Sequence, residues 1–487
     1  MNLATRLSRF LATFSVLLFA VISFHGALLA QWEPDRRLST TDTSARLNEN
    51  MGQCLAVSGD TVHAVWWDVQ NNGSAIFYKH SFDGGVSWGA DTRLTASPSK
   101  ADFPSIAVTG GGVHVVYRDA SGSQNITYYK RSLDGGTSWG HDVSLGDYYW
   151  WPSLAASASM VFVALNDNNP GNTEVYCRRS TDNGATWNTV NQISNAPGRS
   201  EDPSIAAGGG CVHLAWNDNR TGIMQTYYRR SSDQGVTWGP ETRLTDSPVF
   251  AYCPMLFVNG SDVNLAWADR RSGTLDIYFN QSADFGSTWG NEKQLSPEGP
   301  NAVYPVVARD GSNVHVVWWN MNADMVYTHS VDGGKSWGQP VSLVGASSKP
   351  TNPFIVASGT VLHVIWTDQR DGHPAIYYKR DPSGNSTVAG IVSGGTASTP
   401  VRFSLSVFPN PFNPSATVEF SLPVESLVTL HVYDLLGREV ARLFDGERRQ
   451  AGLSSVVFDA SVLSSGVYLC RLDAGPYTTT TKIFLVK

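Results

Sequence analysis

The octapeptide Ser81-Phe82-Asp83-Gly84-Gly85-Val86-Ser87-Trp88 recurs along this 487-residue chain and is the best guide to its architecture. Similar octapeptides begin at Ser132, Ser180, Ser231, Ser282 and Ser330, after steps of 51, 48, 51, 51 and 48 residues. A repeat with a fixed period of about 20–50 residues is typical of solenoids and propellers. The sequence therefore predicts a repeat architecture of at least six units.

Two further phrases accompany the octapeptide and raise the number of units to seven. The first is an apolar run such as Phe103–Ala107, which contains Pro in six copies and lacks it in Gly52–Ala56. The second is a β-branched and aromatic run such as Val62–Asp68. Its copies end at Asp68, Asp119, Asp167, Asp218, Asp269, Asn320 and Asp368. Each unit thus holds four short strand-like runs separated by turn residues, which is typical of a propeller blade. We expect an all-β fold with a seven-bladed β-propeller.

The last unit lacks its fourth strand, and the start of the chain offers a replacement. Asn352–Arg380 is followed by Asp381-Pro382-Ser383-Gly384 in place of a full octapeptide. Near the other end, Trp32–Ser39 parallels the fourth-strand segment Trp238–Thr245. We predict that Trp32–Ser39 pairs beside Ala375–Lys379, because this closure leaves no open sheet edge. A six-bladed ring with a stray pair of strands is the alternative.

The octapeptide resembles the Asp box, or BNR repeat, of sialidases and other propellers. In such a turn Gly supplies a positive φ, Asp and Ser cap backbone N–H groups, and Trp packs over the hairpin. The six structural aspartates are Asp83, Asp134, Asp182, Asp233, Asp284 and Asp332. Repetition in phase favours a scaffold role over six metal or sugar sites. The five cysteines form no CxxC pattern, so we predict no metal site and no cofactor.

Blade geometry divides the loops between two faces. The turn after the second strand and the link to the next blade share one face, called the loop face below, and the octapeptides lie on the other. Residues that break the repeat on the loop face are the candidates for ligand binding. They are Trp67, Arg118, Tyr149, Trp150, Trp151, Arg199, Asp202, Tyr252, Tyr304 and Trp319, and the blade links add Arg46, Glu201 and Phe250. Aromatic rings beside charged groups suit binding of glycans or proteins. Packing of the same rings into the channel mouth or between blades is the alternative.

The resemblance to sialidases also implies a possible enzyme. Sialidases with Asp boxes use three arginines, a Tyr nucleophile backed by Glu, and an Asp acid/base. Their Arg-Ile-Pro phrase is missing here, and those enzymes have six blades. Arg220, Arg271 and Arg370 could supply an arginine triad, but each occupies the same phase of its repeat. We therefore favour a non-enzymatic binding protein, with a sialidase-like exo-glycosidase as the alternative.

The N-terminus has the pattern of a secretory signal peptide over residues 1–30. Arg6 and Arg9 precede the apolar stretch Phe10–Ile22, and small residues end at Ala30. An uncleaved membrane anchor is the alternative. No other apolar stretch approaches the about 20 residues that span a bilayer, so we predict no such span in the mature chain. The formal net charge of −7 argues against nucleic acid as a partner. We place the propeller at 31–384 and a polar linker at 385–400.

Residues 401–487 show no octapeptide and read as a small immunoglobulin-like β-sandwich, with alternating runs such as Val428–Tyr433. Four phrases resemble the C-terminal sorting domain of cargo for the type IX secretion system. They are Phe408–Pro414, Val432–Val440, Ser465–Tyr468 and Lys482–Lys487. The resemblance implies that secretion machinery is a partner and that the product is secreted or held on the outer surface of a Gram-negative bacterium. An adhesive immunoglobulin-like domain is the alternative.

Overall fold

The computed structural model describes residues 32–382 and 404–486, apart from residues 42, 71–72, 97–98, 110–111, 123–124, 148, 168–171, 298–300, 322–323, 346–347, 409–411, 423, 450–451 and 476. The predicted signal peptide and linker lie outside the described residues, and their bounds stay predictions. The chain divides into two compact units, which are treated separately. No helix in the described part has the length and hydrophobicity to cross a membrane.

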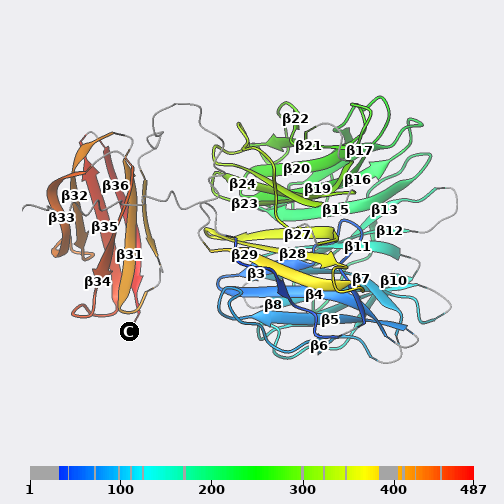
Figure 1. The fold of residues 1–487 in the computed structure, drawn as a ribbon, viewed down its shortest axis with the longest axis horizontal. Coiled ribbons are helices and arrows are strands. Elements are labelled where there is room, and N and C mark those ends of the chain that lie inside the picture. Colours follow the sequence, from blue (N-terminus) through cyan, green and yellow to red (C-terminus); the bar gives the residue numbers. More distant parts are fainter. Residues whose placement is uncertain are drawn as a thin grey trace, which may run out of the picture. The chain divides into compact units, whose positions relative to one another are not determined.

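The first unit is a ring of seven antiparallel sheets, each a propeller blade (Figure 1). Blade 1 contains β2 (Ser44–Arg46), β3 (Leu55–Ser58), β4 (Thr61–Gln70), β5 (Gly73–Ser81) and β6 (Thr92–Arg93). Blade 2 contains β7 (Ala101–Thr109), β8 (Gly112–Asp119), β9 (Ile126–Ser132) and β10 (Val143–Asp147). Blade 3 contains β11 (Tyr149–Ser157), β12 (Met160–Asp167), β13 (Val175–Ser180) and β14 (Asn191–Gln192). Blade 4 contains β15 (Ser200–Gly208), β16 (Cys211–Asp218), β17 (Gln225–Ser231) and β18 (Thr242–Arg243).

The remaining blades follow the same order. Blade 5 contains β19 (Ala251–Asn259), β20 (Asp262–Asp269), β21 (Asp276–Ser282) and β22 (Lys293–Gln294). Blade 6 contains β23 (Ala302–Asp310), β24 (Asn313–Asn320), β25 (Asp324–Ser330) and β26 (Val341–Ser342). Blade 7 contains β27 (Pro350–Ser358), β28 (Val361–Asp368), β29 (Ala375–Asp381) and β1 (Arg36–Arg37).

The N-terminal strand completes the last blade, as predicted. Arg36 pairs with Tyr378 and Arg37 with Tyr377 in an antiparallel ladder. In Figure 1 the yellow strands β27–β29 lie beside the blue strand β3, where the ring closes. Seven blades are therefore present, and the six-bladed alternative is wrong.

Each repeated octapeptide forms a turn held by its own Ser and Asp. In the first copy, Ser81 Oγ donates to Asp83 Oδ1 (2.7 Å) and accepts from the Gly85 amide (2.8 Å). The Ser87 amide donates to Asp83 Oδ1 (2.8 Å). These hydrogen bonds, above all those from Ser87, lower the pKa of Asp83 to about 2. The aspartates thus act as local turn caps, in agreement with the scaffold role.

The same turns join neighbouring blades through an aromatic side chain. Tyr78 of blade 1 reaches the blade 2 octapeptide, where a Cβ at Gly136 would overlap its hydroxyl. Its ring packs edge-on against Trp139, with the centroids 4.9 Å apart. A hydrogen bond of 2.7 Å between Tyr78 Oη and His63 Nδ1 fixes the hydroxyl. Burial lowers the pKa of His63 to about 4, so this histidine is neutral near pH 7.

The second unit, β30 onward, is a β-sandwich of two antiparallel sheets, as predicted. One sheet contains β30 (Ser404–Phe408), β31 (Ser415–Leu422) and β34 (Gly452–Asp459). The other contains β32 (Ser426–Tyr433), β33 (Glu439–Arg449), β35 (Gly466–Ala474) and β36 (Tyr477–Leu485). Phe420, Leu430 and Leu472 are fully buried in its core.

Adjacent glycines provide a test of the contact between blades. Both Gly135 and Gly136 have positive φ (70° and 93°), but nothing lies within 4 Å of a Cβ at Gly135. Gly135→Ala should therefore lower the free energy of unfolding only by the backbone strain, about 1 kcal/mol. Gly136→Ala should lower the free energy of unfolding by clearly more, because the new Cβ would also displace the Tyr78 hydroxyl. Urea unfolding of both variants measures the difference, and equal midpoints would contradict the proposed contact.

Trp32 provides a test of ring closure. Its ring packs edge-on against Tyr327 of blade 6, with the centroids 5.5 Å apart. Because Trp32 is only partly buried, Trp32→Ala should lower the free energy of unfolding by about 2–3 kcal/mol, less than a fully buried Trp. Thermal melting measures the loss, with Phe82→Ala, an exposed aromatic in a turn, as the control. An unchanged melting temperature would show that the Trp32–Tyr327 contact contributes little to closure.

Candidate functional site

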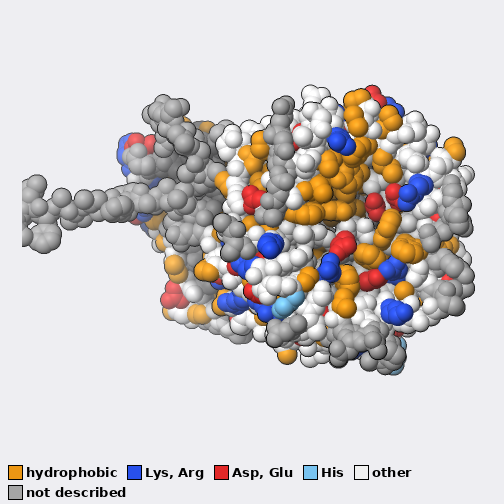
Figure 2. All heavy atoms as spheres, turned by 45° about the vertical axis from the view of Figure 1, so that its right-hand side comes forward, with side chains coloured by type: hydrophobic (Ala, Val, Ile, Leu, Met, Phe, Trp, Pro, Cys, Tyr) orange, Lys and Arg blue, Asp and Glu red, His pale blue; other side chains and the backbone are white. Residues whose placement is uncertain are grey.

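The loop face is turned toward the viewer in Figure 2, where hydrophobic side chains gather near the middle and charged side chains are scattered among and around them. Hydrogen bonds join the two kinds of loop on this face. The Ala120 amide, after β8, donates to the Lys100 carbonyl in the preceding link (3.1 Å). The Asn219 amide does the same with the Arg199 carbonyl (3.1 Å). The face is therefore a fixed scaffold for irregular side chains.

An inner ring of residues lies where the innermost strand of each blade begins. In blades 2–7 two residues bulge out of the pairing with the second strand, and the first of them has a positive φ of 49–57°. These residues are Phe103, Trp151, Asp202, Cys253, Tyr304 and Asn352. Positive φ at a non-glycine residue costs about 1–3 kcal/mol, yet it recurs in six blades, so it belongs to the architecture. Three predicted site residues (Trp151, Asp202 and Tyr304) are members of this inner ring.

Blade 1 departs from this pattern by an insertion. Arg46 pairs with Trp67 and the Cys54 carbonyl accepts from the Val65 amide, which leaves the seven residues Leu47–Gln53 where other blades have two. We call Leu47–Gln53 the central loop. This loop was not predicted, although Cys54 lies eight positions after Arg46 in the sequence and the equivalent Ser105 lies only three after Asp102. That difference in spacing was the available signal.

The central loop crosses from its own blade to the innermost strands of three others. Asn48 Nδ2 donates to the Pro104 carbonyl of blade 2 (2.9 Å), and the Asn48 carbonyl accepts from Asn352 Nδ2 of blade 7 (3.3 Å). The Met51 carbonyl accepts from Ser153 Oγ of blade 3 (3.3 Å). A Cβ at Gly52 would overlap Asn48 Nδ2 and the Pro152 carbonyl, so glycine is required there. The loop thus links blade 1 to the innermost strands of blades 2, 3 and 7.

Several predicted aromatics are partly exposed around this loop or the inner ring. Tyr304 and Trp319 stack in parallel, with their centroids 6.3 Å apart and an interplanar angle of 9°. Trp67 Nε1 donates to the Leu47 carbonyl (3.3 Å), which ties that indole to the central loop. Tyr252 packs against Phe250 at 5.5 Å. Trp150 and Trp151 meet edge-on at 6.1 Å.

Two predicted residues are used within the scaffold. Arg118 is buried, makes a two-pronged ion pair with Asp102, and lies 4.7 Å from the Phe103 ring and 4.2 Å from the Trp150 ring. Tyr149 packs edge-on against Tyr176 at 5.5 Å, in the apolar cluster between blades 2 and 3. The structure does not bring Tyr149 together with the other candidates.

Arg199 and Asp202 lie close together at the start of blade 4. Arg199 is half exposed and forms an ion pair with Glu201. Asp202 Oδ2 accepts from Asn217 Nδ2 (2.9 Å), whereas its Oδ1 is buried without a hydrogen-bond partner. Burial, with the nearby Glu201 charge, raises the pKa of Asp202 to about 7. Asp202 is thus a carboxyl group that changes its charge near neutral pH.

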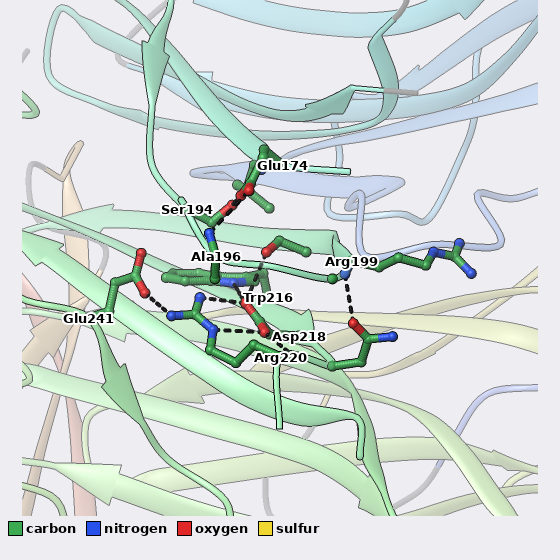
Figure 3. Close-up of polar contacts among 12 residues, drawn as sticks. Glu174, Ser194, Ala196, Arg199, Trp216, Asp218, Arg220 and Glu241 are labelled. Atoms are coloured by element: carbon green, nitrogen blue, oxygen red, sulfur yellow. Dashed lines mark hydrogen bonds and ion pairs between the residues drawn. The ribbon is translucent and has the colours of Figure 1, made fainter. Parts of the chain in front are cut away.

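The three arginines considered for a sialidase triad do not converge. Figure 3 shows Arg220 held by Asp218 and Glu241, while Trp216 Nε1 donates to Asp218 Oδ2 (3.1 Å). Arg220 also lies 4.2 Å from the Tyr227 ring. Arg271 and Arg370 are bound in the same way, to Asp269 with Glu292 and to Asp368 with Asp35. Each arginine is therefore neutralised inside its own blade. The described residues contain no cluster of three or more His, Cys, Asp or Glu that could hold a metal.

Comparison with known proteins identifies the C-terminal domain. Residues 406–487 match the family model described as "Secretion system C-terminal sorting domain". The chain carries a type IX sorting domain. Its product is therefore exported to the exterior or outer surface of a Gram-negative cell, as predicted, and the secretion machinery is its partner. No curated protein matches the chain.

Solved structures with similar folds include carbohydrate-active enzymes. A polysaccharide lyase of family PL25, an ulvan lyase, is 11% identical, with 70% of this chain and 95% of that chain covered and a TM-score of 0.50. The Hadza microbial sialidase Hz136 is 14% identical, with 69% of this chain covered and a TM-score of 0.44. This chain spans 65% of the length of that sialidase. The phage phi92 endosialidase is 12% identical, with 85% and 79% covered and a TM-score of 0.46. At such identities the likeness shows the propeller fold alone.

Asp202 predicts a pH-dependent stability. Its pKa in the folded protein is raised from 3.8 to about 7, so the folded state binds a proton more tightly than the unfolded chain. This stabilisation is complete at low pH and is lost as the pH rises through about 7. Asp202→Asn removes the titration, so the variant should gain melting temperature relative to the wild type between pH 5 and 8. Asp246→Asn, at an 86% exposed side chain, is the control. If the melting temperatures of the wild type and Asp202→Asn change with pH in the same way, the raised pKa of Asp202 is wrong.

Proposed function

We propose that the propeller is an extracellular carbohydrate-binding protein that contacts its ligand through the loop face. The observation that carries this proposal is the set of partly exposed aromatics around the central loop or the inner ring, namely Trp67, Trp151, Tyr304 and Trp319. Flat rings held on a rigid scaffold stack on the apolar faces of sugars, while nearby polar groups reach the hydroxyls. The ulvan lyase, which shares the fold, acts on a polysaccharide, so glycans are the first ligands to screen.

The contacts of the charged groups favour binding over catalysis. The sialidase-like alternative needs free arginines and an Asp acid/base that faces the substrate. Asp102 and Glu201 are instead ion-paired with Arg118 and Arg199, and Asp202 Oδ1 is shielded from solvent. The arginines considered for gripping a sialate carboxylate are neutralised within their blades. These contacts speak against the sialidase-like alternative.

The test combines a glycan array with single substitutions in the purified full-length protein. Trp319→Ala should weaken binding of the best array ligand by about tenfold, which corresponds to 1.4 kcal/mol of lost stacking. Phe82→Ala removes a 60% exposed aromatic from the opposite face and should leave binding unchanged. Isothermal titration gives the dissociation constants, and thermal melting verifies that each variant is folded.

Two results would count against the proposal. Equal loss of binding in Trp319→Ala and Phe82→Ala would mean that the loop face is not the binding surface. Release of the fluorophore from a fluorogenic sialoside, at a rate that the loop-face substitutions reduce, would instead support the exo-glycosidase alternative.

A further inference from the structure

The central loop is where the propeller departs most from its own repeat. Six blades begin their innermost strand with a two-residue bulge, and blade 1 places seven residues there. Hydrogen bonds to blades 2, 3 and 7 fix the loop against the innermost strands of these blades. Side chains on this loop are therefore held beside the innermost strands and close to Trp67, an aromatic of the loop face.

Glu49 is the side chain that the central loop presents to solvent. It is 47% exposed and lies 3.5 Å from Arg46 Nη1, whose side chain is 38% exposed. An exposed ion pair of this kind contributes little stability, about 0–1 kcal/mol, so ligand hydroxyls can compete for both partners. The Arg46 guanidinium also lies 5.9 Å from the Trp67 ring centroid. A carboxylate, a guanidinium and an indole thus converge at one place.

Asn50 fixes the direction of the loop beside Glu49. With its side-chain amide assigned so that oxygen faces the indole N–H, Asn50 accepts a hydrogen bond from Trp151 Nε1 (2.8 Å), and its backbone amide donates to Asn48 Oδ1 (2.8 Å). Met51, the next residue, is only 3% exposed and anchors the loop in the core. Asn50 is therefore a positioning residue, and Glu49 and Arg46 keep hydrogen-bonding capacity for a ligand.

The charges near the inner ring indicate which kind of sugar fits. The arginines there are each paired with a carboxylate: Arg46 with Glu49, Arg118 with Asp102, and Arg199 with Glu201. Three further cations of the loop face lie outside the central loop and are exposed: Lys100 and Lys349, in the links before blades 2 and 7, and Arg270, after β20 and 5.8 Å from the Phe250 ring. At the central loop, Arg46 is already paired with Glu49, so a uronate or sialate carboxylate there would compete with the Glu49 carboxylate for the guanidinium.

We propose that the central loop determines specificity, with Glu49 and Arg46 hydrogen-bonding the hydroxyls of a neutral saccharide that stacks on Trp67. The inference rests on the proposed carbohydrate-binding function and names its ligand class. A carboxylate accepts from two adjacent hydroxyls, and the guanidinium donates to their oxygens. A uronate at this position would instead meet the Glu49 charge.

The test compares two Arg–Glu pairs in the full-length protein. Glu49→Ala should weaken binding of neutral oligosaccharides about 10- to 100-fold, as expected for loss of a hydrogen bond to a charged group. Glu447→Ala breaks a pair of matched exposure in the C-terminal domain (52% and 37%, Glu447 with Arg449) and should leave binding unchanged. Replacement of Leu47–Gln53 by the Phe-Pro of blade 2 should abolish binding while the ring stays folded, as judged by melting.

The array and the titrations use neutral hexose oligosaccharides and uronate-containing oligosaccharides as probes. Preference for the neutral probes, together with the Glu49→Ala loss, supports the inference. Wild-type affinity in Glu49→Ala, with binding lost in Trp319→Ala, would overturn the inference and leave the proposed function standing. Tighter binding of uronates, lost in Arg270→Ala, would also overturn it. Absence of binding to every probe would refute both.

Discussion

The insertion of an aromatic ring from one blade beneath the turn of the next is the contact on which the ring depends. Tyr78, Tyr129, Tyr228 and Tyr378 each occupy the space that a Cβ would take on the glycine two residues after the Asp of the following turn. Each also packs edge-on against the Trp of that turn, at 4.8–5.2 Å. Because Tyr378 belongs to blade 7 and its turn belongs to blade 1, the same contact closes the circle. Trp32 has the corresponding role for blade 7, where it meets Tyr327.

A second periodic contact uses the basic side chains of the third strands. Lys79, Lys130, Arg178, Arg229 and Lys379 each donate to a backbone carbonyl in or just after the outermost strand of the preceding blade. With the Asp–Arg pairs after the second strands, these contacts engage many of the propeller's cations in its own scaffold. Charge that faces a ligand must therefore come from residues outside the repeat, and Arg46 and Glu49 are such residues.

Sequence reasoning succeeded where the structure is periodic, and it was least informative where one blade differs. Seven blades and the pairing of Trp32–Ser39 beside Ala375–Lys379 could be predicted, because each repeat encodes the same local turns and strands. The surroundings of Arg118 could not be predicted from the sequence. Its contacts with Asp102 and with the Phe103 and Trp150 rings depend on the distance between blades 2 and 3. Tyr149 was grouped with its neighbours in sequence, but alternation along β11 directs it into the space between blades.

The central loop shows why spacing is more informative than residue type in a repeat protein. Aromatic and charged residues occur in every blade, so their presence on the loop face does not separate scaffold from site. The extra residues of Leu47–Gln53 cannot fit into the two-residue bulge of the other blades. They extend from the innermost strand of blade 1 and contact the innermost strands of blades 2, 3 and 7. Gly52 permits the loop to pass close to Asn48 and the Pro152 carbonyl, and Met51 fills the core beneath it. Glu49 is exposed to solvent, because Asn48 and Met51 on either side of it are buried. The position of this carboxylate follows from chain length and packing, and the same constraints make its neighbouring aromatics available to a ligand.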